Sequence, residues 1–318
     1  MSEAPKPEGR ASRPFLGTLR ARERAVAYLC ISPWVVGFVA FTLGPMLLSL
    51  VISFTDYDIL NPASTHWVGL DNYRAAAQDR TLAHSVLATL YYAALVIPGD
   101  LILGLVLALA LNVRLRGISI FRTIFFLPVM ISGTGGASVA VALLWLWIFQ
   151  PRFGLLNFML SLVHLPPQLW VYSERLAVPS LALMGIWTVA RSMIVYLAAL
   201  QGLPAEVLWA AEVDGASVWR RFVRITLPLI SPAILFNLVL DLIGALQTFT
   251  QAYLVTAGGP GDATLFYMLY LFRNSFSYLR MGYASALAWL LFGFTLLLTL
   301  VVFRSARKWV YYEGARSR

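Results

Sequence analysis

The stretch QGLPAEVLWAAEVDGASVWRRFVRITLPLISP, residues 201–232, decides how the whole chain is interpreted. Pro204 suits a first helical position, Glu206 favours the positive end of a helix, and Gly215 after Asp214 is a typical stop signal. Together they predict a helix of about ten residues. Its apolar side chains cover more surface than a solvated helix needs. The segment therefore either contacts a partner or lies as an interfacial helix on lipid headgroups.

The second half of this stretch, from Trp219 to Arg224, is amphipathic and basic. Such a segment fits the membrane interface. Pro228 follows directly and suits the start of a membrane span, so residues 202–228 are expected to connect two spans on one side of a bilayer.

The composition also indicates a membrane protein. Of 318 residues, 59% are hydrophobic and 12% are charged, which is too apolar for an ordinary soluble domain. Five stretches of 20 or more residues lack Asp, Glu, Lys and Arg, the longest being 25–55, 123–151 and 281–303. Cys30 has no second cysteine to pair with. These features exclude soluble enzymes, disordered chains, collagens and disulfide-stapled scaffolds.

We expect an all-α integral membrane protein with six transmembrane helices, near residues 26–54, 85–112, 120–149, 177–201, 226–253 and 281–304. With six spans both termini share a side. Of the 24 Lys and Arg residues, 17 lie on that side, so the positive-inside rule places both termini in the cytoplasm. The predicted layout is a tail over 1–24, a first span over 25–55, an outer loop over 56–84, a five-helix core over 85–304 and a tail over 305–318. The first apolar run is too long for a signal peptide and is read as a retained span.

No catalytic constellation is found in the sequence. The two lysines, Lys6 and Lys308, do not follow the glycine spacing of a P-loop, and the three histidines are scattered. The net charge of +9 does not form the basic face of a nucleic-acid reader. Gly133, Gly135 and Gly136 are expected to serve helix packing. The chain is therefore expected to hold no catalytic residue, metal or cofactor.

The connecting segment also resembles a known motif. Its spacing, Ala210-Ala211-x3-Gly215-x9-Ile225-x-Leu227-Pro228, is similar to the EAA loop of binding-protein-dependent ABC importer permeases. The resemblance implies a coupling helix that docks on a cytoplasmic ATPase, with these residues at the contact: Glu206, Trp209, Ala210, Ala211, Glu212, Asp214, Gly215 and Ala216. Trp209 stands where the family has Glu. Glu206 or Glu212 would substitute for it, or the docking is mainly apolar.

Further strings, including RGISIFRTIFFLPVMIS, LAALQGLP and TFTQAYLVTAGGPGDAT, resemble the sugar-type branch of these permeases, the maltose and glycerol-phosphate importers. The resemblance covers nearly the whole chain and implies the type I importer fold in a bacterial inner membrane. It also implies a second, homologous permease subunit, two ATPase subunits that carry Mg-ATP, and an external substrate-binding protein. This chain would then be a transport subunit for a sugar or sugar-like solute, working by alternating access, and not an enzyme.

Three ionisable residues are expected near mid-depth of the membrane: Asp100, Arg191 and Asp241. An isolated charge there costs at least ~2.5 kcal/mol, so they should face the bundle interior, water or one another. One interpretation is an ion pair of Arg191 with Asp100 or Asp241, and the other is a polar wall of a translocation path. Asp100 shares a small-residue stripe with Gly104 and Ala108, which favours a structural role.

Helical spacing gives the candidates for the translocation path, which are Trp187, Arg191, Asn237, Asp241 and Thr248. The cluster of Trp145, Trp147 and Phe149 is interpreted as an interfacial aromatic belt, with a sugar-binding platform as the alternative. The GLDNY region and the turn over Gly258–Gly261 are expected outside. Three alternatives remain: an ATP-independent secondary transporter or channel, an ABC importer of a non-sugar solute, and an integral-membrane enzyme. The enzyme lacks catalytic residues, and the secondary transporter or channel leaves residues 202–228 unexplained.

Overall fold

The computed structural model describes residues 15–113, 116–132 and 135–311 of the chain, and their side chains except at 15–21, 131–132 and 135–138. Over these ranges the regular elements are helices, joined by two isolated bridges, Thr55 with Trp67 and Asp58 with Arg280. The chain divides into two compact units, Met1–Ile52 and Ser53–Arg318. The all-α class is confirmed.

The first unit is a helical rod. Helix α1 (Phe15–Phe38), a π-helical turn (Val39–Leu43) and α2 (Gly44–Ile52) follow one another without a break. Residues Arg22–Ile52 are long and apolar enough to span a membrane, and none of their side chains is buried in the unit. A helix that is apolar all round is expected to be surrounded by lipid or by another chain.

The second unit is built around α4 (Arg80–Leu111), a helix of 32 residues. The helices that pack on it are α8 (Ala177–Ile186), α9 (Ala190–Gln201), α13 (Ser231–Leu246) and α14 (Tyr267–Phe272). Helix α9 comes so close that a Cβ atom on Gly104 would lie 2.5 Å from Oγ of Ser192. Ala108, one turn further along, is fully buried. The small-residue stripe therefore permits a close helix approach, as the sequence predicted.

Two of the predicted spans are bent. The α8–α9 pair bends by 42°, and the helix over Val218–Leu229, which ends in α12 (Leu227–Leu229), meets α13 at 64°. By length and composition three described helices could cross a membrane, or five if each bent pair is one span. The third predicted span falls on α5 (Ile118–Ser132) and α6 (Gly135–Ile148). The packing proposed for Gly133, Gly135 and Gly136 lies outside the described residues and side chains.

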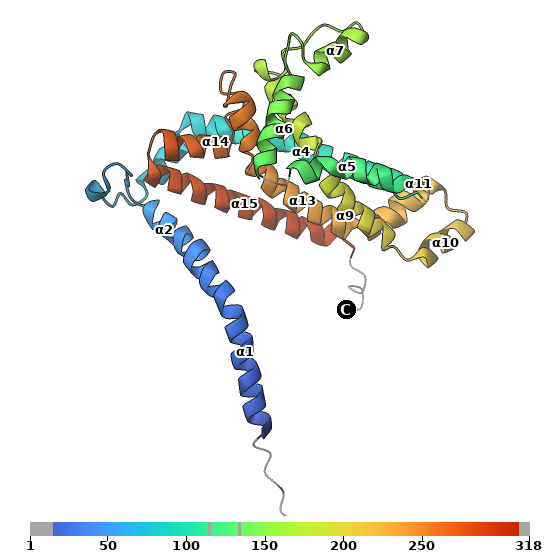
Figure 1. Cartoon of the computed structure of the whole chain (residues 1–318), viewed down its shortest axis with the longest axis horizontal. Helices are drawn as coiled ribbons and strands as arrows, with labels where there is room; N and C mark the ends of the chain where they lie inside the picture. Colours follow the sequence, from blue (N-terminus) through green and yellow to red (C-terminus); the bar gives the residue numbers. More distant parts are fainter. Residues whose placement is uncertain (1–14, 114–115, 133–134, 312–318) are drawn as a thin grey trace, which may run out of the picture. The chain divides into compact units, whose positions relative to one another are not determined.

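The two ends of the second unit carry different elements. Helices α10 (Ala205–Val213) and α11 (Val218–Arg221) lie together at one end, and α14 lies at the other (Figure 1). The end with α14 also carries α3 (Asp71–Gln78), and α15 (Met281–Trp309) runs between the two ends (Figure 1). A further short helix, α7 (Leu155–Leu162), follows α6. The segment between the predicted fourth and fifth spans is thus remote from the predicted outer loop 56–84.

The interpretation of the aromatic cluster as a belt is wrong for two of its three residues. Trp145 and Phe149 are buried in the core, where Trp145 meets the edge of Trp187 with ring centroids 6.0 Å apart. Only Trp147 is exposed, as a residue at a lipid interface should be. Trp145 and Phe149 are buried because α6 packs against the π-helical turn Ala252–Thr256, which follows α13.

Candidate functional site

Helix α10 has the boundaries of an independent structural element. It begins at Ala205, with Pro204 as the preceding cap and not as the first helical residue. At its other end Gly215 adopts a left-handed conformation with φ of +72°. The N–H of Gly215 donates to the carbonyl of Glu212, and the N–H of Ala216 donates to that of Ala211, both at 3.0 Å. This is a Schellman cap, which explains why glycine ends the helix.

The exposed surface of α10 is unusually apolar. Trp209 is 66% exposed and Val213 is 88% exposed, while Ala211 is turned inward and Ala210 remains at the surface. Of the two alanines expected at the contact, only Ala210 can therefore be touched from outside. The helix presents a tryptophan and a valine where a solvated helix would carry charges.

An ion pair connects α10 to the helix that follows it. Nη1 of Arg221 donates to Oε2 of Glu212 at 2.8 Å. Glu212 is therefore engaged within the chain, while no ion pair involves Glu206 among the described residues. Of the two acids predicted to replace the missing acidic contact, Glu206 is the one whose carboxylate is free of an internal cation.

The predicted ion pair between spans is present, and Asp241 is the partner of Arg191. Nη2 of Arg191 on α9 donates to Oδ1 of Asp241 on α13 at 2.9 Å. The Asp241 side chain is 6% exposed, whereas that of Arg191 is 58% exposed. The guanidinium therefore holds α13 with one nitrogen and presents the rest of its surface to open space.

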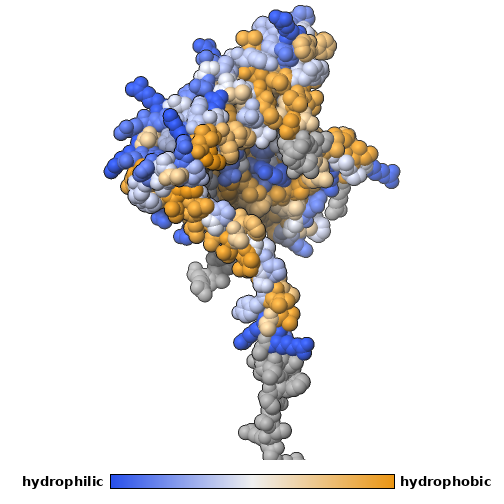
Figure 2. Space-filling model, turned by 60° about the vertical axis from the view of Figure 1, so that its left-hand side comes forward, coloured by the Kyte–Doolittle hydropathy of each residue, from blue (hydrophilic) through white to orange (hydrophobic). Residues whose placement is uncertain are grey.

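That space is a polar cavity of about 240 Å³. Its walls come from α4, from the α8–α9 bend, and from the C-terminal half of α13 with the residues that follow it. The lining residues are Tyr92, Val96, Asp100, Gly185, Thr188, Arg191, Asp241, Gly244, Ala245, Thr248 and Gln251. One face of the molecule has a hollow where hydrophilic surface is surrounded by hydrophobic surface (Figure 2).

The cavity brings together three of the five residues predicted for the translocation path: Arg191, Asp241 and Thr248. Asn237 is buried and donates to the carbonyl of Ser192 at 3.3 Å, and so ties α13 to α9. Trp187 packs on Trp145 and is not among the lining residues.

Other lining residues were missed by the sequence reasoning. The hydroxyl of Tyr92 donates to Oε1 of Gln251 at 3.1 Å, and Thr188 lies at the α8–α9 bend. Tyr92, Val96 and Asp100 follow the four-residue spacing of one helix face, and that spacing could have identified them. On this helix face the sequence analysis considered only Asp100 and the residues after it, Gly104 and Ala108.

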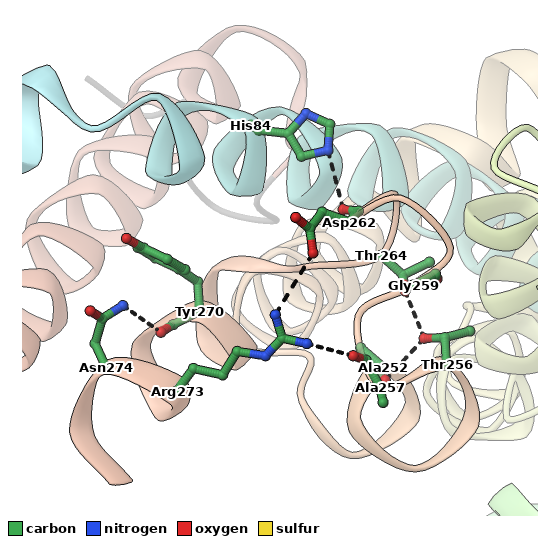
Figure 3. Close-up of polar contacts among 10 residues, drawn as sticks. All are labelled: His84, Ala252, Thr256, Ala257, Gly259, Asp262, Thr264, Tyr270, Arg273 and Asn274. Atoms are coloured by element: carbon green, nitrogen blue, oxygen red, sulfur yellow. Dashed lines mark hydrogen bonds and ion pairs between the residues drawn. The ribbon is translucent and has the colours of Figure 1, made fainter. Parts of the chain in front are cut away.

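The turn over Gly258–Gly261 is fixed by polar contacts from α4 and from the π-helical turn Arg273–Ser277 that follows α14 (Figure 3). Arg273 donates to the carbonyl of Ala257 at 2.6 Å and lies 3.7 Å from the Asp262 carboxylate, while Nε2 of His84 lies 3.1 Å from the Asp262 carbonyl. Oγ1 of Thr264 donates to the carbonyl of Gly259 at 2.8 Å (Figure 3). This turn is therefore held in one shape at the end of the unit opposite α10.

Asp79 fixes the same end of α4. Its Oδ1 accepts from the N–H groups of Thr81 and Leu82, and its Oδ2 accepts from the hydroxyls of Tyr270 and Tyr283. Burial acts to raise the pKa of Asp79, but these four hydrogen bonds outweigh it and hold the pKa below its ordinary value. One carboxylate thus caps α4 and joins it to α14 and α15.

A helical membrane unit with a polar cavity inside and a capped helix projecting at one end defines a multi-pass transport subunit. A sequence profile described as "Binding-protein-dependent transport system inner membrane component" matches residues 100–310. The chain belongs to this family. It is accordingly a multi-pass bacterial inner-membrane protein and a permease subunit of an ABC importer, and not an enzyme.

Curated relatives support the assignment over the full length. The chain is 40% identical to the probable ABC transporter permease protein YesP of Bacillus subtilis (strain 168), over 92% of this chain and 94% of that protein. It is 31% identical to the trehalose/maltose transport system permease protein MalF of Thermococcus litoralis, over 91% and 96%. It is also 31% identical to the sulfoquinovosyl glycerol transport system permease protein SmoG of Agrobacterium fabrum, over 90% and 91%.

Solved structures share the fold. A chain from a bacterial ABC transporter involved in the import of the acidic polysaccharide alginate superposes with a TM-score of 0.77 at 26% identity, covering 90% of this chain and 96% of that chain. A second chain, at 24% identity and a TM-score of 0.75, comes from the alginate transporter in complex with a periplasmic protein that carries an alginate pentasaccharide. The second likeness concerns the fold alone.

Proposed function

We propose that this chain is one of two permease subunits of an ATP-driven, binding-protein-dependent importer for a sugar or sugar-like solute. The observation that carries the proposal is α10, a capped helix that exposes Trp209 and Val213 at the end opposite the outer turn. An exposed apolar helix of this kind is suited to a groove on another protein. The relatives named for maltose, trehalose and sulfoquinovosyl glycerol support the solute class.

In this proposal the partners are a second homologous permease, two ATPase subunits that bind Mg-ATP, and an external substrate-binding protein. The contact with the ATPase is made by the residues on and after α10, which are Glu206, Trp209, Ala210, Glu212, Asp214, Gly215 and Ala216, while Ala211 packs inward behind them. Both termini and the segment 202–228 lie in the cytoplasm, with residues 25–55 as the first span and 85–304 as the core.

The solute would pass the cavity lined by Arg191, Asp241 and Thr248. Carboxylate, amide and hydroxyl groups suit sugar hydroxyls, and Tyr92 and Gln251 add two more polar groups to the three predicted residues. The second permease would supply the opposite wall. ATP-driven closure of the ATPase pair would pull α10, and the helices around the cavity would rock to open it to the other side.

Copurification tests the assembly. A tagged chain expressed with its native partners should bring down an ATPase subunit and a second permease, and deletion of 206–216 should remove the ATPase while the chain still inserts in the membrane. Gly215→Asp should abolish uptake, because a side chain with a Cβ is strained at φ of +72° and the cap is lost. Gly215→Asn, which tolerates this conformation better, is the matched control.

Retention of the ATPase by the 206–216 deletion, with normal uptake, would refute the docking role of α10. Transport by the purified chain alone would instead favour an ATP-independent transporter or channel.

A further inference from the structure

Two carboxyl groups lie on the wall of the polar cavity. Asp100 on α4 is 9% exposed and Asp241 on α13 is 7% exposed, and both line it. Oδ2 of Asp100 and Oδ2 of Asp241 are both fully buried and have no hydrogen-bond partner in the described part of the protein. Buried polar atoms in folded proteins almost always have such a partner, so a pair left without one requires an explanation.

The charges around the pair do not balance. Arg191 on α9 supplies one positive charge and contacts Oδ1 of Asp241. No other cationic side chain lines the cavity among the described residues. The remaining titratable groups that face the pair are the phenols of Tyr92 on α4 and Tyr196 on α9, which carry no positive charge. Two carboxylates therefore stand against one guanidinium.

An unbalanced negative charge at this depth is costly. Ionised carboxylates carry only acceptor oxygens, and neither Oδ2 atom has a donor among the described residues. A small positive charge bound by both carboxyl groups would supply the missing partner and make the group of three residues neutral. The imbalance is one unit of charge, so a monovalent cation balances it, whereas a divalent ion would leave the group positively charged.

We propose that the Asp100–Asp241 pair binds one monovalent cation, a proton or a sodium ion, shared between the two carboxyl groups. A proton would form an O–H bond on one carboxyl and a hydrogen bond to the other, and a sodium ion would be coordinated by both. The bound cation holds α4 against α13 and keeps Asp241 in the position from which Arg191 faces the cavity. Asp100 is thus a positioning residue. The inference rests on the packing of this chain and is independent of which solute the importer carries.

Thermal unfolding of the purified importer complex tests the site without any solute. In the first series the unfolding temperature is measured from neutral to alkaline pH without sodium. In the second series sodium is added at one alkaline pH, and potassium serves as the control salt. In the wild type, release of the cation leaves an uncompensated buried charge, and the unfolding temperature should fall by at least about 3 °C. Recovery with sodium but not potassium identifies a sodium site, whereas a fall that sodium does not reverse identifies a proton.

Asp100→Asn is the decisive variant, because its amide donates to Asp241 and leaves one carboxylate against one guanidinium. Its unfolding temperature should not depend on the bound cation. The decrease that the wild type shows at alkaline pH should therefore be absent. Asp241→Asn has the same charge count and gives the same comparison should Asp100→Asn not assemble. A wild type that is insensitive in both series, or variants that show the full dependence of the wild type, would overturn the proposal.

Discussion

Glu212 and Arg221 form an ion pair in which Nη1 of Arg221 lies 2.8 Å from Oε2 of Glu212. The pair bridges the turn that contains Gly215, so α10 is joined to α11 by a side-chain contact as well as by the backbone. Helix α11 continues through a π-helical turn into α12 and the fifth predicted span. A displacement of α10 is therefore passed to the core along two connections.

Loss of this ion pair should weaken transport without preventing membrane insertion. Glu212 is 67% exposed, so the pair is worth roughly 0.2–1 kcal/mol, and Glu212→Gln should lower uptake by at most about fivefold. The double variant with Glu212→Arg and Arg221→Glu should recover most of the loss. Uptake in proteoliposomes at fixed ATP is the measurement, and a charge swap as poor as the single variants would assign the loss to direct contacts of either residue.

The intramembrane ion pair permits a separation of stability from transport. Arg191→Ala alone leaves Asp241 without its cation, which should cost about 3–5 kcal/mol and reduce assembly. The triple variant with Asp100→Asn, Arg191→Met and Asp241→Leu removes all three charges and should restore the unfolding temperature. Uptake should stay low in both variants, because the polar wall is gone. Normal uptake by the triple variant would show that these residues do not line the path.

Gly282 should be intolerant of a side chain. A Cβ atom there would lie 2.0 Å from the backbone carbonyl oxygen of Thr55, and the N–H of Gly282 donates to the carbonyl of Tyr57 at 3.2 Å. Gly282→Ala should therefore displace residues 55–57 and lower the unfolding temperature. Gly293→Ala on the same helix meets nothing within 4 Å and should be neutral or slightly stabilising. Equal behaviour of the two variants would contradict the close contact.

Asp79 predicts an acid-dependent loss of stability. Because its pKa is lowered in the folded protein, the stabilisation is present above the unfolded pKa of about 3.9 and is lost as pH falls through the folded value. Asp79→Asn keeps an acceptor for the helix cap but has no charge to lose. The difference in unfolding temperature between wild type and variant should be largest near about pH 6 and shrink toward about pH 3. A difference that does not change with pH would mean that the charge of the Asp79 carboxylate does not contribute to the stability of the fold.

Sequence reasoning was strongest where a local rule acts. The Gly215 stop needs only the left-handed backbone that glycine permits, and the close approach at Gly104 needs only a missing side chain. Both were predicted from spacing. The count of six spans stays a prediction, because it depends on how the helices around residues 133–134 continue and on how the bent pairs cross the membrane.

Sequence reasoning was weaker where two helices meet. The partner of Arg191 was left open between Asp100 and Asp241, because the choice depends on how α9 and α13, which border the bends of 42° and 64°, pack on each other. The second bend falls between Pro228 and Pro232, and this pair of prolines is a sequence signal for a break in a helix. The first bend, over 187–189, contains no proline. Trp145 was misplaced for a related reason, since the helix that covers it comes from a distant part of the chain.

The two bends have a mechanical consequence. Arg191 follows the α8–α9 bend almost immediately, and α9 is tied to α13 by Asn237 and by the ion pair. Helix α8, on the other side of the first bend, belongs to a separate aromatic core around Tyr92 and Phe266. The segment Val218–Leu229, which follows α10, lies on the other side of the second bend from α13. A displacement of α10 need change only a few backbone torsions at the second bend to move this segment, while α9 and α13 stay joined.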